Sequence, residues 1–111
     1  MAVNAQVSFD REKLAEFCRI NGIVKLSIFG SALRDDFRPD SDIDVLVEFS
    51  PDRIPGLFAY AGMEMSLPPL FGGRKVDLKV AEELSRHFRQ AVLDTAEVQY
   101  VEGQGVIAGH P

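Results

Sequence analysis

Two carboxylates one residue apart open an apolar stretch, Asp42-Ile43-Asp44-Val45-Leu46-Val47. In a β-strand, alternate residues share a face, so Asp42 and Asp44 would point to one side, about 6.5–7 Å apart along the backbone. The apolar residues between and after them would point to the other side and bury. Two hard oxygen donors on one rigid element suit Mg²⁺, which completes its shell with water and phosphate. Without a cation the carboxylates would repel and raise each other's pKa. We therefore expect Asp42 and Asp44 to bind magnesium.

A third carboxylate, Asp77, lies in a stretch with the same alternation, Lys75-Val76-Asp77-Leu78-Lys79-Val80. The three apolar residues predict a buried face, and Asp77 shares the other face with the two lysines. If this strand lies beside strand 41–49, Asp77 joins the first two acids. Three carboxylates can hold two cations ~3.5–4 Å apart, an arrangement that stabilises both the attacking and the leaving oxygen in phosphoryl or nucleotidyl transfer.

A Gly30-Ser31 step follows the apolar run Leu26–Phe29 and precedes Asp42 by ten intervening residues. Glycine lets a backbone approach a phosphate closely, and a helix that starts at Ser31 would aim free N–H groups at it. The Ser31 hydroxyl can add a hydrogen bond, and Arg34 lies one turn further on. We expect Gly30, Ser31 and Arg34 to bind the nucleotide.

The elements that must position these residues alternate between helix and strand. We expect helices at 10–21, from about 57 to the Pro68-Pro69 pair, and at 82–93, and strands at 23–29, 41–49, 75–80 and 98–101. Strand 41–49 follows strand 23–29 too soon for a parallel crossover, which favours antiparallel or mixed pairing. The pattern predicts an α/β or α+β fold, a mixed sheet of about four strands, with the helices packed on one side.

The stretch from residue 57 to residue 71 leaves two interpretations open. It is dense in large apolar side chains, namely Phe58, Tyr60, Met63, Met65, Leu67, Leu70 and Phe71. A helix packed on the core would use them. An interface would use them too, because methionine and aromatic residues are enriched where partners dock.

The composition describes one small globular domain, which we place at residues 1–101, with a flexible tail at 102–111. No apolar run approaches the ~18 residues of a spanning helix, so we expect no membrane association. The N-terminus does not resemble a signal peptide, and the single cysteine suits a reducing cytoplasm. The net charge of −5 disfavours direct nucleic-acid binding and favours a basic partner or bound cations.

Gly30-Ser31, ten residues and then Asp42-Ile43-Asp44 reproduce the GS-x10-DxD signature of the DNA polymerase β-like nucleotidyltransferase superfamily. The small size, Arg34 and the later Val76-Asp77-Leu78 resemble its minimal nucleotidyltransferase (MNT) branch, over about residues 10–100. The resemblance implies a single nucleotidyltransferase domain, two Mg²⁺ ions on Asp42, Asp44 and Asp77, and ATP bound at Gly-Ser. One departure is Asp35, because family members often carry glycine after the arginine; we expect Asp35 to face solvent or to pair with Arg38.

Free-standing bacterial MNT proteins are often antitoxins that pair with a helical HEPN toxin, and several transfer AMP from ATP to a toxin tyrosine with release of pyrophosphate. The resemblance implies the same for this chain. The oligomeric state, a homodimer or a hetero-oligomer with the toxin, stays open. Two alternatives stay open: an antitoxin that masks its partner by binding alone, and a small-molecule transferase like the antibiotic-modifying relatives.

Overall fold

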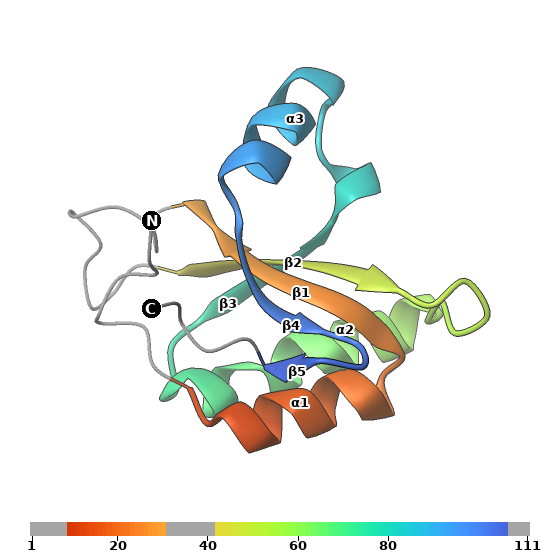
Figure 1. Ribbon diagram of the computed structural model, residues 1–111, viewed down its shortest axis with the longest axis vertical. Helices are drawn as coiled ribbons and strands as arrows, with labels where there is room; N and C mark the ends of the chain where they lie inside the picture. The colour runs from red at the N-terminus through yellow and green to blue at the C-terminus, as the bar shows by residue number, and fades with distance from the viewer. Residues whose placement is uncertain (1–8, 31–41, 107–111) are drawn as a thin grey trace.

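The computed structural model describes residues 9–30 and 42–106, which form a mixed sheet with helices on both faces (Figure 1). The helices are α1 (Arg11–Ile20), α2 (Leu57–Ser66) and α3 (Arg86–Thr95), with short 3-10 turns η2 (Pro68–Phe71) and η3 (Ala81–Glu83). The strands are β1 (Ile23–Phe29), β2 (Ile43–Phe49), β3 (Val76–Val80), β4 (Glu97–Val101) and β5 (Gly105–Val106). Their order is β3-β2-β1-β4-β5, with β2 and β3 parallel and the other pairs antiparallel.

The predicted fold class is confirmed, and most predicted elements lie within two residues of the observed ones. The Asp10 carboxylate caps α1 by accepting from the Lys13 N–H at 3.1 Å, and the helix ends at Asn21. Strands β1 and β2 pair antiparallel, as their short separation favoured. Pro68 ends α2 and begins η2, because proline cannot donate the backbone hydrogen bond that would continue the helix.

A fifth strand extends the sheet into the stretch that we expected to be a flexible tail. Gly103 has a φ of +87°, and the Gln104 N–H donates to the Val101 carbonyl at 3.0 Å. This tight turn returns the chain along β4, so that Val106 pairs with Tyr100. The expectation of a tail therefore stands only for residues 107–111, which lie outside the described part of the chain.

The main core lies between one face of the sheet and helices α1 and α2. Its members include Leu14 and Cys18 from α1, Met63 from α2, and alternate residues of the central strands such as Ile28 and Val45. Burial raises the pKa of the Cys18 thiol to about 12, so this cysteine is an apolar core residue rather than a reactive thiol.

The expectation that the helices pack on one side is wrong, because α3 covers the opposite face (Figure 1). There Val92 from α3 and Leu84 pack against Phe29 and Leu46, whose neighbours in the strands point into the main core. The last helix also begins later than predicted, since the Ser85 hydroxyl accepts from the Phe88 N–H at 3.2 Å and caps it. Leu84 therefore lies before the helix rather than in it.

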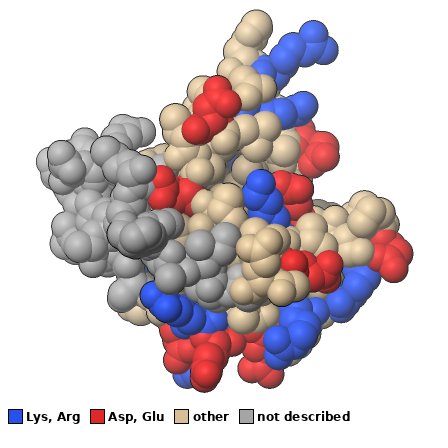
Figure 2. All heavy atoms as spheres, viewed as in Figure 1, with Lys and Arg blue, Asp and Glu red and all other residues tan. Residues whose placement is uncertain are grey.

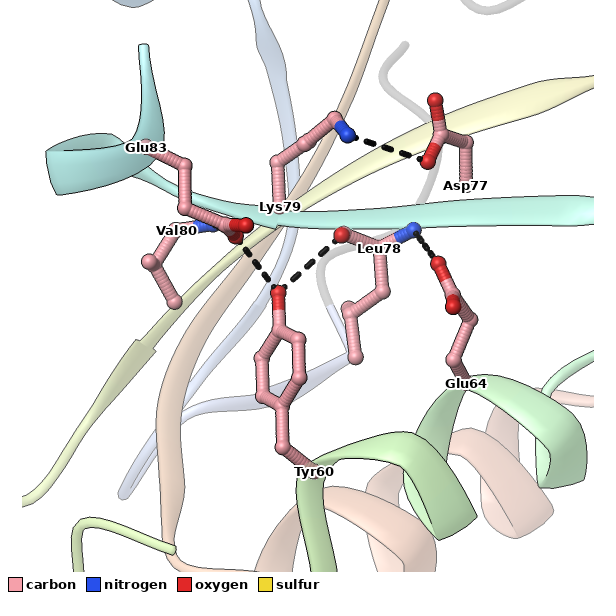
Figure 3. A network of polar contacts seen from close by, with 7 residues as sticks. All are labelled: Tyr60, Glu64, Asp77, Leu78, Lys79, Val80 and Glu83. Atoms are coloured by element: carbon pink, nitrogen blue, oxygen red, sulfur yellow. Dashed lines mark hydrogen bonds and ion pairs between the residues drawn. The ribbon is translucent and has the colours of Figure 1, made fainter. Parts of the chain in front are cut away.

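Helix α2 also covers the open edge of β3, as Figure 3 shows. The Glu64 carboxylate accepts from the Leu78 N–H at 2.8 Å. The Tyr60 hydroxyl lies 3.0 Å from the Leu78 carbonyl oxygen and 2.7 Å from Glu83 Oε1, and its one proton can go to either. Glu83 also accepts from the Val80 N–H at 3.0 Å. Side chains thus hydrogen-bond to the backbone groups of Leu78 and Val80 at the edge of the sheet. Without these bonds, the groups would be available to pair with another strand.

Tyr60→Phe is expected to lower the free energy of unfolding by about 0.5–1.5 kcal/mol, because the part-buried Leu78 carbonyl and the exposed Glu83 carboxylate lose their donor. The substitution keeps the ring, and with it the edge-to-face contact with Phe49 at a centroid distance of 6.4 Å. A urea titration followed by circular dichroism measures the difference. An unchanged midpoint would show that the hydroxyl does not hold α2 to the edge.

The described surface mixes charges of both signs on the face drawn in Figure 2, where acidic and basic side chains lie interspersed. Two surface ion pairs join neighbouring residues of the sheet, Lys25 with Glu48 at 3.9 Å and Lys79 with Asp77 at 3.3 Å. Within the described residues, none of the helices is long and apolar enough to span a bilayer.

Candidate active site

Asp44 and Asp77 lie side by side on neighbouring strands. In the parallel pair of β2 and β3, Asp44 is the register partner of Asp77. Register partners in adjacent strands share a face and lie about 4.8 Å apart across the pair. Both residues are half-buried. Asp42 lies two residues before Asp44, directly ahead of β2, and is also half-buried. The topology therefore brings the three acids to one end of the β2–β3 pair, which was only a conditional expectation from the sequence.

Gly30, directly after β1, packs against Asp44. Phe29, the last residue of β1, is the register partner of Asp44, which brings the next residue to the carboxylate. Gly30 has a φ of +74°, a conformation that side chains disfavour. A Cβ at this position would overlap Asp44 Oδ2 and lie 3.2 Å from Asp44 Cγ. Glycine is therefore favoured here by the backbone angle, and a larger residue would also force the Asp44 carboxylate to shift.

Lys79 binds the third acid. Its Nζ lies 3.3 Å from Asp77 Oδ1, and both residues project from the same face of β3 (Figure 3). The hydrogen bond and the charge of Asp77 raise the pKa of Lys79, so the lysine carries its full charge beside the carboxylates. Sequence alternation placed Lys79 on this face, but the rotamer that makes the contact cannot be read from alternation. Within residues 9–30 and 42–106, Lys79 is a side chain of the site that the sequence analysis did not assign.

Among residues 9–30 and 42–106, no group of three or more His, Cys, Asp and Glu side chains is arranged to hold a metal ion. The acids fit Mg²⁺ by donor type and by their place on the sheet. The Asp77 carboxylate, however, is paired with Lys79, so binding between the strands would require it to exchange that lysine for the cation. Ser31 and Arg34, the predicted phosphate ligands, and Asp35 lie outside the described residues.

An apolar cluster borders the acids on the same face of the sheet. Leu46 follows the acids along β2, and Phe29 precedes Gly30. Both are buried beneath Leu84 and Val92. Apolar packing on one side limits water at this end of the strands and holds β1 and β2 in place, so the carboxylates stand on a rigid base. The amphipathic pattern of residues 82–93 indicated a helix, but it could not show which sheet face the helix would cover.

The fold thus brings together paired acids on adjacent parallel strands and a glycine that packs against one of them. The nucleotidyltransferase domain family model matches residues 11–100, and the chain belongs to this family. The matched region includes Gly30, Asp42, Asp44 and Asp77. It also includes every described element except β5 and the last residue of β4.

Particular relatives narrow the comparison. The chain is 38% identical over 80 residues to "Protein adenylyltransferase MntA" of Thermococcus cleftensis, an alignment that covers 72% of this chain and 76% of the relative. A solved structure assigned as a minimal nucleotidyltransferase is 36% identical, with a TM-score of 0.63, over 78% of this chain and 85% of that one. A toxin–antitoxin crystal structure with AMP-PNP shares the fold at 21% identity and a TM-score of 0.66, over 86% and 76% of the two chains. The resemblance to the MNT branch is thereby confirmed.

Proposed function

We propose that this nucleotidyltransferase is an antitoxin that transfers AMP from ATP to a tyrosine hydroxyl of a helical HEPN toxin, with release of pyrophosphate. The observation that carries the proposal is the register pairing of Asp44 with Asp77 beside Gly30. The relative from Thermococcus cleftensis, named as a protein adenylyltransferase, supports the protein acceptor.

The proposed reaction breaks one P–O bond and makes another. The acceptor hydroxyl oxygen attacks the α-phosphorus of ATP, and the bond from that phosphorus to the bridging oxygen of the β-phosphate breaks. Pyrophosphate leaves, and the hydroxyl proton passes to Asp77. Such transfers depend mainly on position and on the neutralisation of charge. The rigid β2–β3 pair supplies position, since both acids project from paired strands rather than from loops.

Asp42, Asp44 and Asp77 would hold two Mg²⁺ ions, which neutralise phosphate charge and polarise the reacting oxygens when bound. Gly30, Ser31 and Arg34 would bind the β- and γ-phosphates. In this proposal Gly30 contributes its backbone, because a side chain there would displace the Asp44 carboxylate. The exchange of Lys79 for a cation at Asp77 leaves a charged ammonium beside the site, where it can meet the triphosphate.

The test begins with a search of the reading frames next to the gene of this chain for a HEPN protein. The two proteins are then co-expressed, and the intact mass of the HEPN protein is measured by mass spectrometry. We expect mass increases of whole AMP units on a tyrosine, and none with an Asp42→Ala/Asp44→Ala variant that still binds the partner. Toxicity would return with the variant. If the variant protects cells as well as the wild type does, neutralisation occurs by masking, and the catalytic proposal fails.

A further inference from the structure

The outward face of α2 carries an apolar stripe that the described part of the chain leaves uncovered. We name it the α2 stripe: Leu57, Phe58, Ala61, Gly62 and Met65. Leu57 is 81% exposed, Phe58 91% and Met65 80%, and Ile54, just before the helix, is 71% exposed. Glu64 is the one charged residue in the helix, and it bonds inward to β3. A contiguous uncharged apolar face of this kind marks an interaction site.

The orientation of α2 is fixed from its inner side, so the stripe is not exposed by loose packing. Met63 and Leu67 are buried in the main core. Tyr60 and Glu64 make the hydrogen bonds to β3 that Figure 3 shows. Because these four residues anchor the helix to the core and to the sheet edge, it cannot rotate about its axis to bury Phe58.

Gly62 is the second observation, and this chain's own fold does not explain it. A Cβ added at Gly62 would meet nothing within 4 Å, and the residue has no positive φ. Glycine in a helix interior nevertheless costs about 1 kcal/mol relative to alanine. A glycine in the middle of an exposed apolar stripe is the residue that permits another backbone to approach closely. The helix thus carries a close-contact position that has no partner among residues 9–30 and 42–106.

We propose that the α2 stripe is the two-fold interface of a homodimer, in which α2 packs antiparallel on α2 of a second copy. The stripe is self-complementary about the point between Ala61 and Gly62. In an antiparallel pair Phe58 of one copy faces Met65 of the other, and the small residues meet at the crossing point. Such isologous contact is how most homodimers form.

Charge and area also fit a second copy. Each chain carries a net charge of −5, so two copies repel at long range. An interface without charged residues adds no further repulsion at contact. The three large side chains of the α2 stripe and the adjacent Ile54 are mostly exposed, and together they present on the order of 600 Å² per copy, at ~150 Å² each. Two copies would bury about 1,200 Å², the lower end of stable protein interfaces.

The dimer goes beyond the proposed function and leaves it intact. The α2 stripe lies on the helix that covers the core face of the sheet, whereas Asp44 and Asp77 belong to the opposite face. Two copies joined through α2 would therefore present their acid faces outward, each open to nucleotide and to a separate partner.

The test is sedimentation equilibrium of the purified full chain at ~100 µM, well above a micromolar Kd. We expect twice the 12.3 kDa of one chain for the wild type, with tighter association at high salt because screening weakens the repulsion. Phe58→Glu and Gly62→Leu should both give monomers with unchanged circular dichroism. Gly62→Leu is the sharper variant, since leucine favours the helix and opposes only the close approach.

Phe88→Glu is the matched control, because Phe88 is 53% exposed on α3, outside the stripe, and should leave the dimer intact. A monomeric wild type at all salt concentrations overturns the dimer. So does equal dissociation by the control, or a dimer that survives both stripe variants. If the wild type is monomeric and Phe58→Glu abolishes binding to the HEPN protein, the stripe belongs to that partner instead. Unchanged AMP transfer by Phe58→Glu separates this inference from the proposed function.

Discussion

Asp44→Asn is expected to lower the rate of AMP transfer by ~10²–10³-fold, about 2.7–4 kcal/mol of transition-state stabilisation. Asp44 is the register partner of Asp77 and the residue against which Gly30 packs, so it stands at the centre of the proposed site. The amide keeps the shape of the side chain but removes the negative charge that would hold a cation. The measurement is the initial rate of AMP incorporation at saturating ATP and magnesium.

Glu48→Gln is the matched control for this prediction. Glu48 belongs to the same strand, four residues further on, and loses the same charge without a change of shape. Its carboxylate is exposed and paired with Lys25 at 3.9 Å, away from β3. We expect less than a twofold change in rate. Equal losses in both variants would mean that the net charge of the strand, rather than the position of Asp44, governs transfer.

Gly30→Ala is expected to reduce both stability and activity. The backbone angle of +74° costs an alanine about 1–2 kcal/mol, and the added Cβ overlaps Asp44 Oδ2. Either the carboxylate or the end of β1 must move, and we expect AMP transfer to fall by ~10²-fold, the cost of a displacement of about 1 Å. Thermal unfolding and the initial rate of transfer report the two effects separately.

Gly72→Ala separates backbone strain from the clash. Gly72 has a nearly equal φ of +69°, but a Cβ there meets nothing within 4 Å. This variant should lose the same 1–2 kcal/mol of stability and keep its activity. A fully active Gly30→Ala variant would show that the contact with Asp44 does not matter for transfer.

Strand alternation predicted the faces of β2 and β3 because period 2 is a local property of the chain. It predicted Asp42 and Asp44 on one side of β2 and Asp77 on one side of β3, and the observed burial of Ile43, Val45 and Leu78 agrees. Whether the two strands are neighbours, and in which register, depends on the crossover through α2. No local pattern encodes that crossover, so the pairing of Asp44 with Asp77 is a result of the structure.

The side of the sheet that α3 covers was missed for a related reason. Leu84, Phe88, Ala91 and Val92 have helical spacing, but Ser85 caps the helix after Leu84, and Phe88 remains 53% exposed. The buried apolar face of α3 is therefore narrower than the spacing of these residues indicated. On β2, this face of α3 packs against Leu46, a single apolar residue on a strand face otherwise occupied by acids. An apolar residue among charged ones gives little sign that a helix packs on it.

The parallel pair of β2 and β3 has a thermodynamic consequence for the acids that it aligns. Parallel neighbours need a long connection, and here it contains α2 and η2. Asp44 and Asp77 stand at the two ends of that loop, and closing it costs chain entropy. A cation held by both acids acts as a reversible cross-link across the loop, and at 100 times its Kd it adds about 2.7 kcal/mol to the free energy of unfolding. Under the proposed function, cation binding and the stability of the fold would therefore be thermodynamically linked.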